Sequence, residues 1–310
     1  MFDLFLYPIL VILLVIFVYF IPGLALFPKF IQSPRSSASI PFISISTLAG
    51  IQYLLSLVNQ FSQASVLSII ALLSFIAFYK IYKNYSEFQN SWTKLDLKVL
   101  LFIIFSSIPL MVLLGFDGFQ HSDEIYSWNL WAKKIYLGIK VTFESTGSPY
   151  PLVLSSFIAF CYKFFGNMDF QLPIKFTFSI IYISTIFVIY SFVNTKVKLG
   201  LFFITYIIIM LVIGVGYEYK KVFADTLMGG LLVTSLALLI SLSKDLFDKN
   251  NNISPYSYLF ASIILVSTAA LTKQGAMLWA FCFYPLLALV IIGKNSYLNN
   301  RAKVITLIPL

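Results

Sequence analysis

Long apolar runs, separated by short polar segments, dominate the pattern along this chain. Each run holds about 20 residues, enough for a helix to cross a hydrocarbon core about 30 Å thick. The first run, LFLYPILVILLVIFVYF at residues 4–20, shows no alternation of apolar and polar positions. This pattern favours helices over the strands of a membrane barrel. We therefore expect an all-α fold, a polytopic transmembrane helical bundle.

The expected spans are 4–27, 40–61, 65–82, 98–115, 172–193, 199–216, 225–243, 257–272 and 276–293. The first is too long for the core of a signal peptide and has neither a preceding basic region nor a small-residue cleavage site. We expect it to be a retained span. The last residues, VITLIPL, read as the start of a further span beginning at 304.

Charge separates the two faces of the expected bundle. The chain is 60% hydrophobic and 11% charged, with a formal net charge of +9. Suppose that the N-terminus lies outside and that the short apolar segment 150–165 does not cross. The cytoplasmic loops then hold thirteen basic residues and four acids, whereas the outer side holds eight of each.

This excess of basic residues on the cytoplasmic side fits the positive-inside rule. If 150–165 crossed, Lys196 and Lys198 would move outside and the bias would weaken. The net charge therefore indicates topology, and nothing in it suggests nucleic-acid binding.

One outer segment, GFQHSDEIYSWNLWAKKIYLG at 118–138, is unusually polar for this chain. It belongs to an expected outer loop, 116–171. Its second part reads as an amphipathic helix lying in the membrane interface, whose apolar contacts with lipid would come from Ile125, Trp128, Leu130, Trp131 and Ile135. The adjacent Asp123 and Glu124 would stand at the N-terminus of this helix. They either cap it or provide a carboxylate that accepts a proton from a hydroxyl group.

Other charged residues lie at span ends on the same expected side. Lys220, Lys221 and Asp225 stand at the mouth of the span 225–243. Lys273 lies in a tight turn between two apolar runs, and no acid lies near it in the sequence. Lysines at span ends are usually anchors whose ammonium groups reach the interface. A cation held in the turn would instead suit a phosphate leaving group.

The order of these features resembles a known family. An apolar span leads to Asp123–Glu124 and Tyr126, followed by GSPYPLVLSSFIAFCYKFFG at 147–166, ADTLMGGLL at 224–232 and ALTKQGAM at 270–277. This order resembles the membrane-embedded GT-C glycosyltransferases, of the protein O-mannosyltransferase and lipid A aminoarabinose transferase type (family 39-like). The resemblance covers roughly residues 95–295. The family's doubled proline is a single proline in YPLV, and its C-terminal part is missing here.

The resemblance implies a domain division and a reaction. Residues 1–94 would be additional N-terminal transmembrane helices, and 95–310 a GT-C-like catalytic domain that is truncated relative to the family. The donor would be a sugar on a polyprenyl phosphate, and the acceptor a hydroxyl of a lipid, glycan or protein. The protein would sit in a bacterial inner or plasma membrane, in contact with its lipids. Its active site would face the extracytoplasmic side.

The resemblance also implies roles for individual residues. Asp123 would be the general base in a single, inverting displacement, and Glu124 and Asp225 would orient the acceptor or the sugar. Lys273, with Lys220 or Lys221, would hold the departing phosphate, and Tyr150 would shape the return of the loop into the membrane. Some relatives use a divalent metal such as Mg²⁺ or Mn²⁺. One acidic pair with a distant Asp does not by itself indicate a metal site, so none is assigned.

Three other function classes stay open, one of which is a purely structural membrane subunit. A transporter or flippase for a lipid-linked sugar would place ionisable residues within broken helices near the midplane, often in repeated halves. The candidate charges lie instead at span ends, and the sequence has no internal repeat. A polysaccharide polymerase or ligase would be expected to place arginines in the outer loop, whereas Arg35 and Arg301 both fall on the expected cytoplasmic side.

Overall fold

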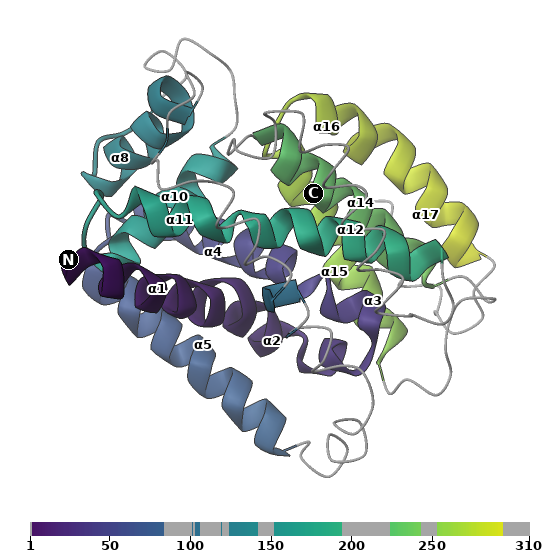
Figure 1. The fold of residues 1–310 in the computed structure, drawn as a ribbon. Helices are drawn as coiled ribbons and strands as arrows, with labels where there is room; N and C mark the ends of the chain where they lie inside the picture. The colour runs from purple at the N-terminus through teal and green to yellow at the C-terminus, as the bar shows by residue number, and fades with distance from the viewer. Residues whose placement is uncertain are drawn as a thin grey trace, which may run out of the picture.

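The computed structural model describes residues 2–83, 101, 103–105, 119, 124–141, 152–193, 224–242 and 253–293, and every regular element within these ranges is a helix. The first group of helices consists of α1 (Phe2–Leu14), η1 (Val15–Phe20), α2 (Ile21–Leu26), η2 (Pro28–Gln32), α3 (Pro34–Ser37), α4 (Ile40–Leu57) and α5 (Gln63–Lys83). The middle group is η3 (Glu124–Asn129), α8 (Leu130–Tyr136), α10 (Val153–Phe165), α11 (Gln171–Thr177) and α12 (Ser179–Val193). The last group is α14 (Ala224–Ile240), α15 (Pro255–Ala270), α16 (Gly275–Leu278), η5 (Trp279–Phe283) and α17 (Tyr284–Gly293). Figure 1 shows their arrangement.

Four stretches are long and apolar enough to cross a membrane, namely Leu6–Leu26, Ile40–Leu57, Gln63–Lys83 and Gln171–Ser191. Shorter apolar helices occupy Val153–Phe165, Ala224–Ile240, Pro255–Ala270 and Gly275–Ile291. The prediction of an all-helical fold is confirmed for the described residues, and four of their helical stretches have the length and apolar composition that a membrane protein needs. The expected spans at 199–216 and from 304 lie outside the described residues, and only 101 and 103–105 of the span 98–115 are described.

The helices define two ends of the bundle. At one end, Lys80 Nζ donates to the carbonyl oxygen of Ala25 at 2.6 Å, so the last turn of α5 lies beside the last turn of α2. A lysine there satisfies a carbonyl that the helix cannot use internally and complements the helix dipole. The rings of Phe30 and Tyr258 lie 5.4 Å apart, which brings the start of α15 to the same end. We call this the Lys80 end.

At the opposite end, called the Gln63 end, three chain reversals place a residue in the left-handed region, namely Asn59, Gly138 and Gly166. After α10, Gly166 N–H bonds to Lys163 O and Asn167 N–H to Tyr162 O, both at 3.2 Å. This pair of bonds is a Schellman motif, for which glycine is the favoured residue. A side chain on Gly166 would also collide with Gln63. The C-terminus of α10 therefore lies beside the start of α5.

The helices from the predicted N-terminal segment, 1–94, pack directly on later ones. Helix α4 packs on α10 and α15, and α1 packs along α11. Gly23 permits a close approach within the N-terminal group, because a Cβ there would stand 2.6 Å from the backbone oxygen of Ile40. Small residues allow membrane helices such contact. The predicted boundary at 94–95 lies outside the described residues.

Helix α10 covers most of the ambiguous apolar segment 150–165. It has 13 residues, so it is about 20 Å long and shorter than a hydrocarbon core about 30 Å thick. Tyr162 and Phe157 within it are fully buried. Its last turn lies at the Gln63 end, followed by the first turn of α11.

Candidate functional site

Of the residues assigned to the site from sequence, Asp225 and Lys273 are the two that the structure brings together. Glu124 is the first residue of η3. The positions of Asp123, Tyr150, Lys220 and Lys221 lie outside the described residues. The geometry of the site is therefore built from Asp225, Lys273 and the helix that begins at Glu124.

Asp225 and Lys273 form an ion pair across 48 residues of sequence. Lys273 Nζ donates to both carboxylate oxygens of Asp225, at 2.5 Å and 2.7 Å. Asp225 lies in the first turn of α14, where the helix dipole favours a negative charge. Lys273 follows the end of α15, and its carbonyl oxygen accepts the N–H of Ala276 at 3.1 Å, near the start of α16.

The expectation that Lys273 has no acid nearby is wrong in three dimensions. Helices α14 and α15 pack against each other as antiparallel neighbours, so the start of one meets the end of the other. The pair remains partly open to its surroundings, with the Asp225 side chain 60% exposed and that of Lys273 28% exposed. An exposed pair of this kind adds little to stability, about 0–1 kcal/mol. Either charged group can therefore exchange its partner for another at a small cost in free energy.

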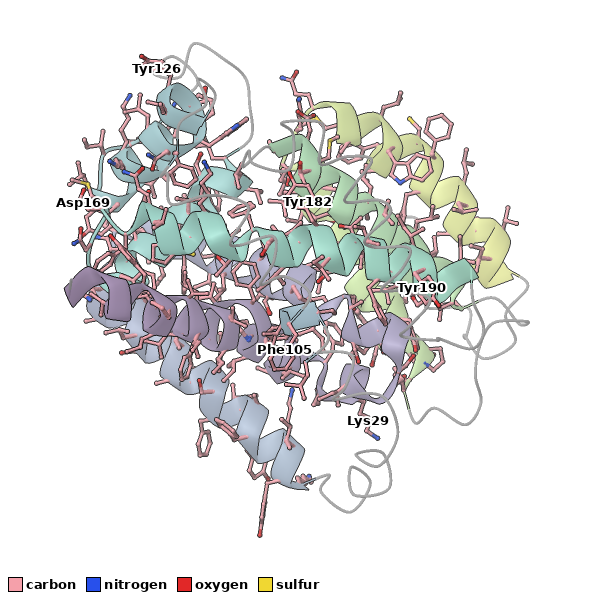
Figure 2. All side chains as sticks on the ribbon, viewed as in Figure 1. Lys29, Phe105, Tyr126, Asp169, Tyr182 and Tyr190 are labelled. Carbon is pink, nitrogen blue, oxygen red and sulfur yellow. The ribbon has the colours of Figure 1, made fainter. Side chains whose placement is uncertain are left out.

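The neighbouring residues hold this pair in place. Tyr182, labelled on α12 in Figure 2, lies within hydrogen-bond distance of Thr226, with 3.2 Å between the two hydroxyl oxygens. In the turn after α15, Thr272 Oγ1 donates to the carbonyl oxygen of Thr268 at 2.7 Å. The residue after Asp225 thus contacts α12, and the residue before Lys273 is bonded to the last turn of its own helix, α15.

The segment 124–136, formed by η3 and α8 and called the loop helix below, is helical as predicted. Its expected contacts are wrong in part, because Trp128, Trp131 and Ile135 are buried in the protein and not turned to lipid. They belong to the face that packs on α10. Tyr126 is 73% exposed, and Figure 2 shows it at the outer edge of the molecule. The exposed face is therefore the one available to the membrane interface.

The structure also contains buried polar groups that the sequence did not indicate. Tyr162 OH donates to Asn129 Oδ1 at 2.6 Å, which joins α10 to the loop helix. Lys175 on α11 is 4% exposed and is the one buried charged side chain among the described residues. A lysine inside the apolar run QLPIKFT could have indicated this position, because a charge in a membrane span is costly and is usually retained for function.

Metal ligands do not gather in the part of the chain that the structure describes, where no three His, Cys, Asp or Glu residues stand close enough to hold an ion. The chemistry that these residues offer is that of one carboxylate and one ammonium group. They can orient hydroxyl groups and neutralise an anion.

Comparisons with known proteins add no relative. The chain matches no protein-family model, no curated protein and no solved structure.

Proposed function

We propose that this chain is an integral-membrane glycosyltransferase of the GT-C type. It transfers a sugar from a polyprenyl phosphate to an acceptor hydroxyl on the extracytoplasmic side. The observation that carries the proposal is the Asp225–Lys273 pair, which joins α14 to the turn after α15. A cation oriented at the end of an apolar bundle suits the phosphate of a lipid-borne donor.

The reaction is a single displacement at the anomeric carbon. Asp123 accepts the proton of the acceptor hydroxyl while the acceptor oxygen forms a bond to that carbon. The bond between the anomeric carbon and the phosphate oxygen breaks, and the polyprenyl phosphate leaves with the electron pair. The configuration is inverted. Glu124 orients the acceptor, and Tyr150 shapes the loop around it.

Lys273 neutralises the charge that develops on the departing phosphate. In the structure, Asp225 holds its ammonium group at the mouth of α14. Because this ion pair is partly exposed, the phosphate can share or replace the carboxylate. Asp225 is then free to orient the sugar, and Lys220 or Lys221 adds charge for the phosphate.

We also propose an orientation for the bundle in the membrane. The Gln63 end faces the extracytoplasmic side of a bacterial inner or plasma membrane, and the Lys80 end faces the cytoplasm. This direction is supported by the surplus of basic residues that the predicted topology gives to the cytoplasmic loops. A divalent metal is not needed by the steps above.

A transporter or flippase for lipid-linked glycans is the second candidate. Buried Lys175, within the candidate span Gln171–Ser191, favours it, because transporters place ionisable groups inside spans. The Asp225–Lys273 pair, which is exposed and joins helix ends, favours the transferase.

Transfer of a radiolabelled sugar from a polyprenyl-phosphate donor, in membranes containing the full chain, tests the proposal. Replacing the general base, Asp123→Asn, lowers the rate by about 10²–10⁴-fold. Asp169→Asn is the matched control, since Asp169 is an exposed acid in the turn after α10, and it leaves transfer unchanged. Wild-type membranes that move the lipid-linked sugar across the bilayer without transferring it would favour the transporter.

A further inference from the structure

The loop helix is attached to the bundle at two points. In its first half, Ser155 Oγ on α10 donates to the carbonyl oxygen of Trp128 at 3.0 Å. At its C-terminal end, Tyr136 OH donates to the carbonyl oxygen of Gly166 at 2.8 Å. Lys163 Nζ lies 4.4 Å from the centre of the Tyr136 ring, a cation–π contact. A helix attached at two separated points keeps its tilt.

Between these two points, Asn129 forms the central polar contact. Its Oδ1 accepts the Tyr162 hydroxyl at 2.6 Å, and its Nδ2 reaches Gln171 Oε1 at 3.4 Å. Asn129 is only 6% exposed, and Tyr162 is fully buried. A buried amide that loses its partner has also lost its contact with water, which is costly. This cost opposes rotation of the loop helix about its own axis.

The first turn of the loop helix has an uncommon geometry that links Asn129 to Glu124. Residues 124–129 form a π-helix, in which hydrogen bonds run between residues five apart. Glu124 and Asn129 are therefore one turn apart. In an α-helix, residues three or four apart are stacked, and a pair five apart diverges. Turns of this kind are frequent at functional sites.

We propose that Asn129 is a positioning residue for Glu124. Its bond with Tyr162 fixes the rotation of the loop helix, and the π-turn carries that orientation to Glu124 at the helix start. The consequence for catalysis rests on the proposed function: a fixed rotation keeps Glu124, which orients the acceptor, in one place. Misplacing a reacting group by about 1 Å can cost about 100-fold in rate.

Spin-label distances test the positioning without any activity. One label replaces exposed Tyr126 on the loop helix, and the other replaces Tyr53 on α4, which is 61% exposed. Exposed Cys282 is replaced by serine in all variants, and buried Cys161 is retained. Wild type gives one narrow distance distribution, and both Tyr162→Phe and Asn129→Ala broaden it. A distribution as narrow in Asn129→Ala as in wild type would overturn the proposal.

The matched control is Tyr284→Phe. This change also removes a buried hydroxyl, which lies 2.8 Å from Ser262 Oγ and belongs to α17. It leaves the distance between the labels unchanged. Broadening in this variant equal to that in Tyr162→Phe would mean general loosening of the bundle and would overturn the assignment to Asn129.

Kinetic measurements on the same variants distinguish a failure of the positioning role from a failure of the proposed function. Tyr162→Phe and Asn129→Ala each lower kcat by roughly 10- to 100-fold, while KM for the donor is unchanged. The double variant is no worse than Asn129→Ala alone, because that change already removes the bond that Tyr162→Phe breaks. An unchanged kcat in an active enzyme with broadened distances would overturn the positioning role. A wild-type protein that transfers no sugar would overturn the proposed function, and the distances alone would then decide whether Asn129 holds the helix.

Discussion

The loop helix and the Asp225–Lys273 pair lie at the same end of the bundle, but they are held in opposite ways. The loop helix is attached through buried hydrogen bonds, with Asn129 6% exposed and bonded to Tyr162. The two charged residues meet in an ion pair in which Asp225 is 60% exposed. In Figure 1, α8 and α16 both lie at the upper edge of the view.

This difference indicates which group can move during a reaction. A buried hydrogen bond is costly to break because both partners lose water as well as each other. An exposed ion pair contributes little, since water and other ions can replace either partner. The first arrangement suits a group that must stay in place, and the second suits a cation that must accept a ligand.

The largest expected effect comes from removing the cation. Lys273→Met lowers kcat of sugar transfer by about 10²–10³-fold, the usual cost of removing one group that stabilises developing charge. The measurement is the initial rate with saturating donor. Lys140→Met, which alters an exposed lysine after the loop helix, is the control and keeps the wild-type rate. Equal rates for the two variants would contradict the role of Lys273 in transfer.

Helix packing, not the ion pair, should hold α14 in place. A Cβ on Gly230 would stand 2.5 Å from a ring carbon of Phe42, whereas one on Gly229 would meet nothing within 4 Å. Gly230→Ala therefore destabilises the fold by about 1–3 kcal/mol through overpacking. Gly229→Ala stabilises it by up to about 1 kcal/mol through helix propensity. Denaturant unfolding in detergent measures both, and a loss of stability in Gly229→Ala would contradict the packing.

Buried serines should join α14 to α15. Ser262 Oγ donates to the carbonyl oxygen of Ser235 at 2.7 Å, and Ser235 Oγ donates to that of Ser262 at 2.9 Å. Ser262→Ala costs about 1 kcal/mol, a typical value for hydrogen bonds between membrane helices. Ser267→Ala is the control, because Ser267 bonds only within its own helix, to Ile263. Unfolding free energies that fall equally in both variants would contradict this role.

The ion pair itself should have the smallest effect on stability. Asp225→Asn changes the free energy of unfolding by less than about 1 kcal/mol, whereas Asn129→Ala costs about 1–3 kcal/mol. Unfolding of the two variants in the same detergent compares the regions directly. Equal losses of stability would show that exposure does not separate the two contacts.

Much of the helical fold could be predicted from the sequence, because apolar runs of about 20 residues have few other stable forms in a membrane. The helices α4, α5 and α12 fall close to their expected spans. Asp225 was assigned to the first turn of a span, and Lys273 to a turn, from polarity alone. Each lies where it was expected.

The contacts between these elements could not be predicted in the same way. The pairing of Asp225 with Lys273 depends on how α14 packs on α15, which no local pattern records. The apolar face of the loop helix was assigned to lipid, yet Trp128 and Trp131 pack on protein. Lipid and a membrane protein interior are equally apolar, so hydrophobic periodicity does not distinguish them.

Binding of farnesyl phosphate, a short polyprenyl phosphate, to the purified full chain tests the central claim most directly. Titration calorimetry in detergent would compare wild type, Lys273→Met and Asp225→Asn. The account predicts that Lys273→Met weakens binding by about 10- to 100-fold, the value of one charge-assisted hydrogen bond. Asp225→Asn binds at least as tightly as wild type, because the competing carboxylate is gone. Wild-type affinity in Lys273→Met would contradict the claim that this cation receives the donor phosphate.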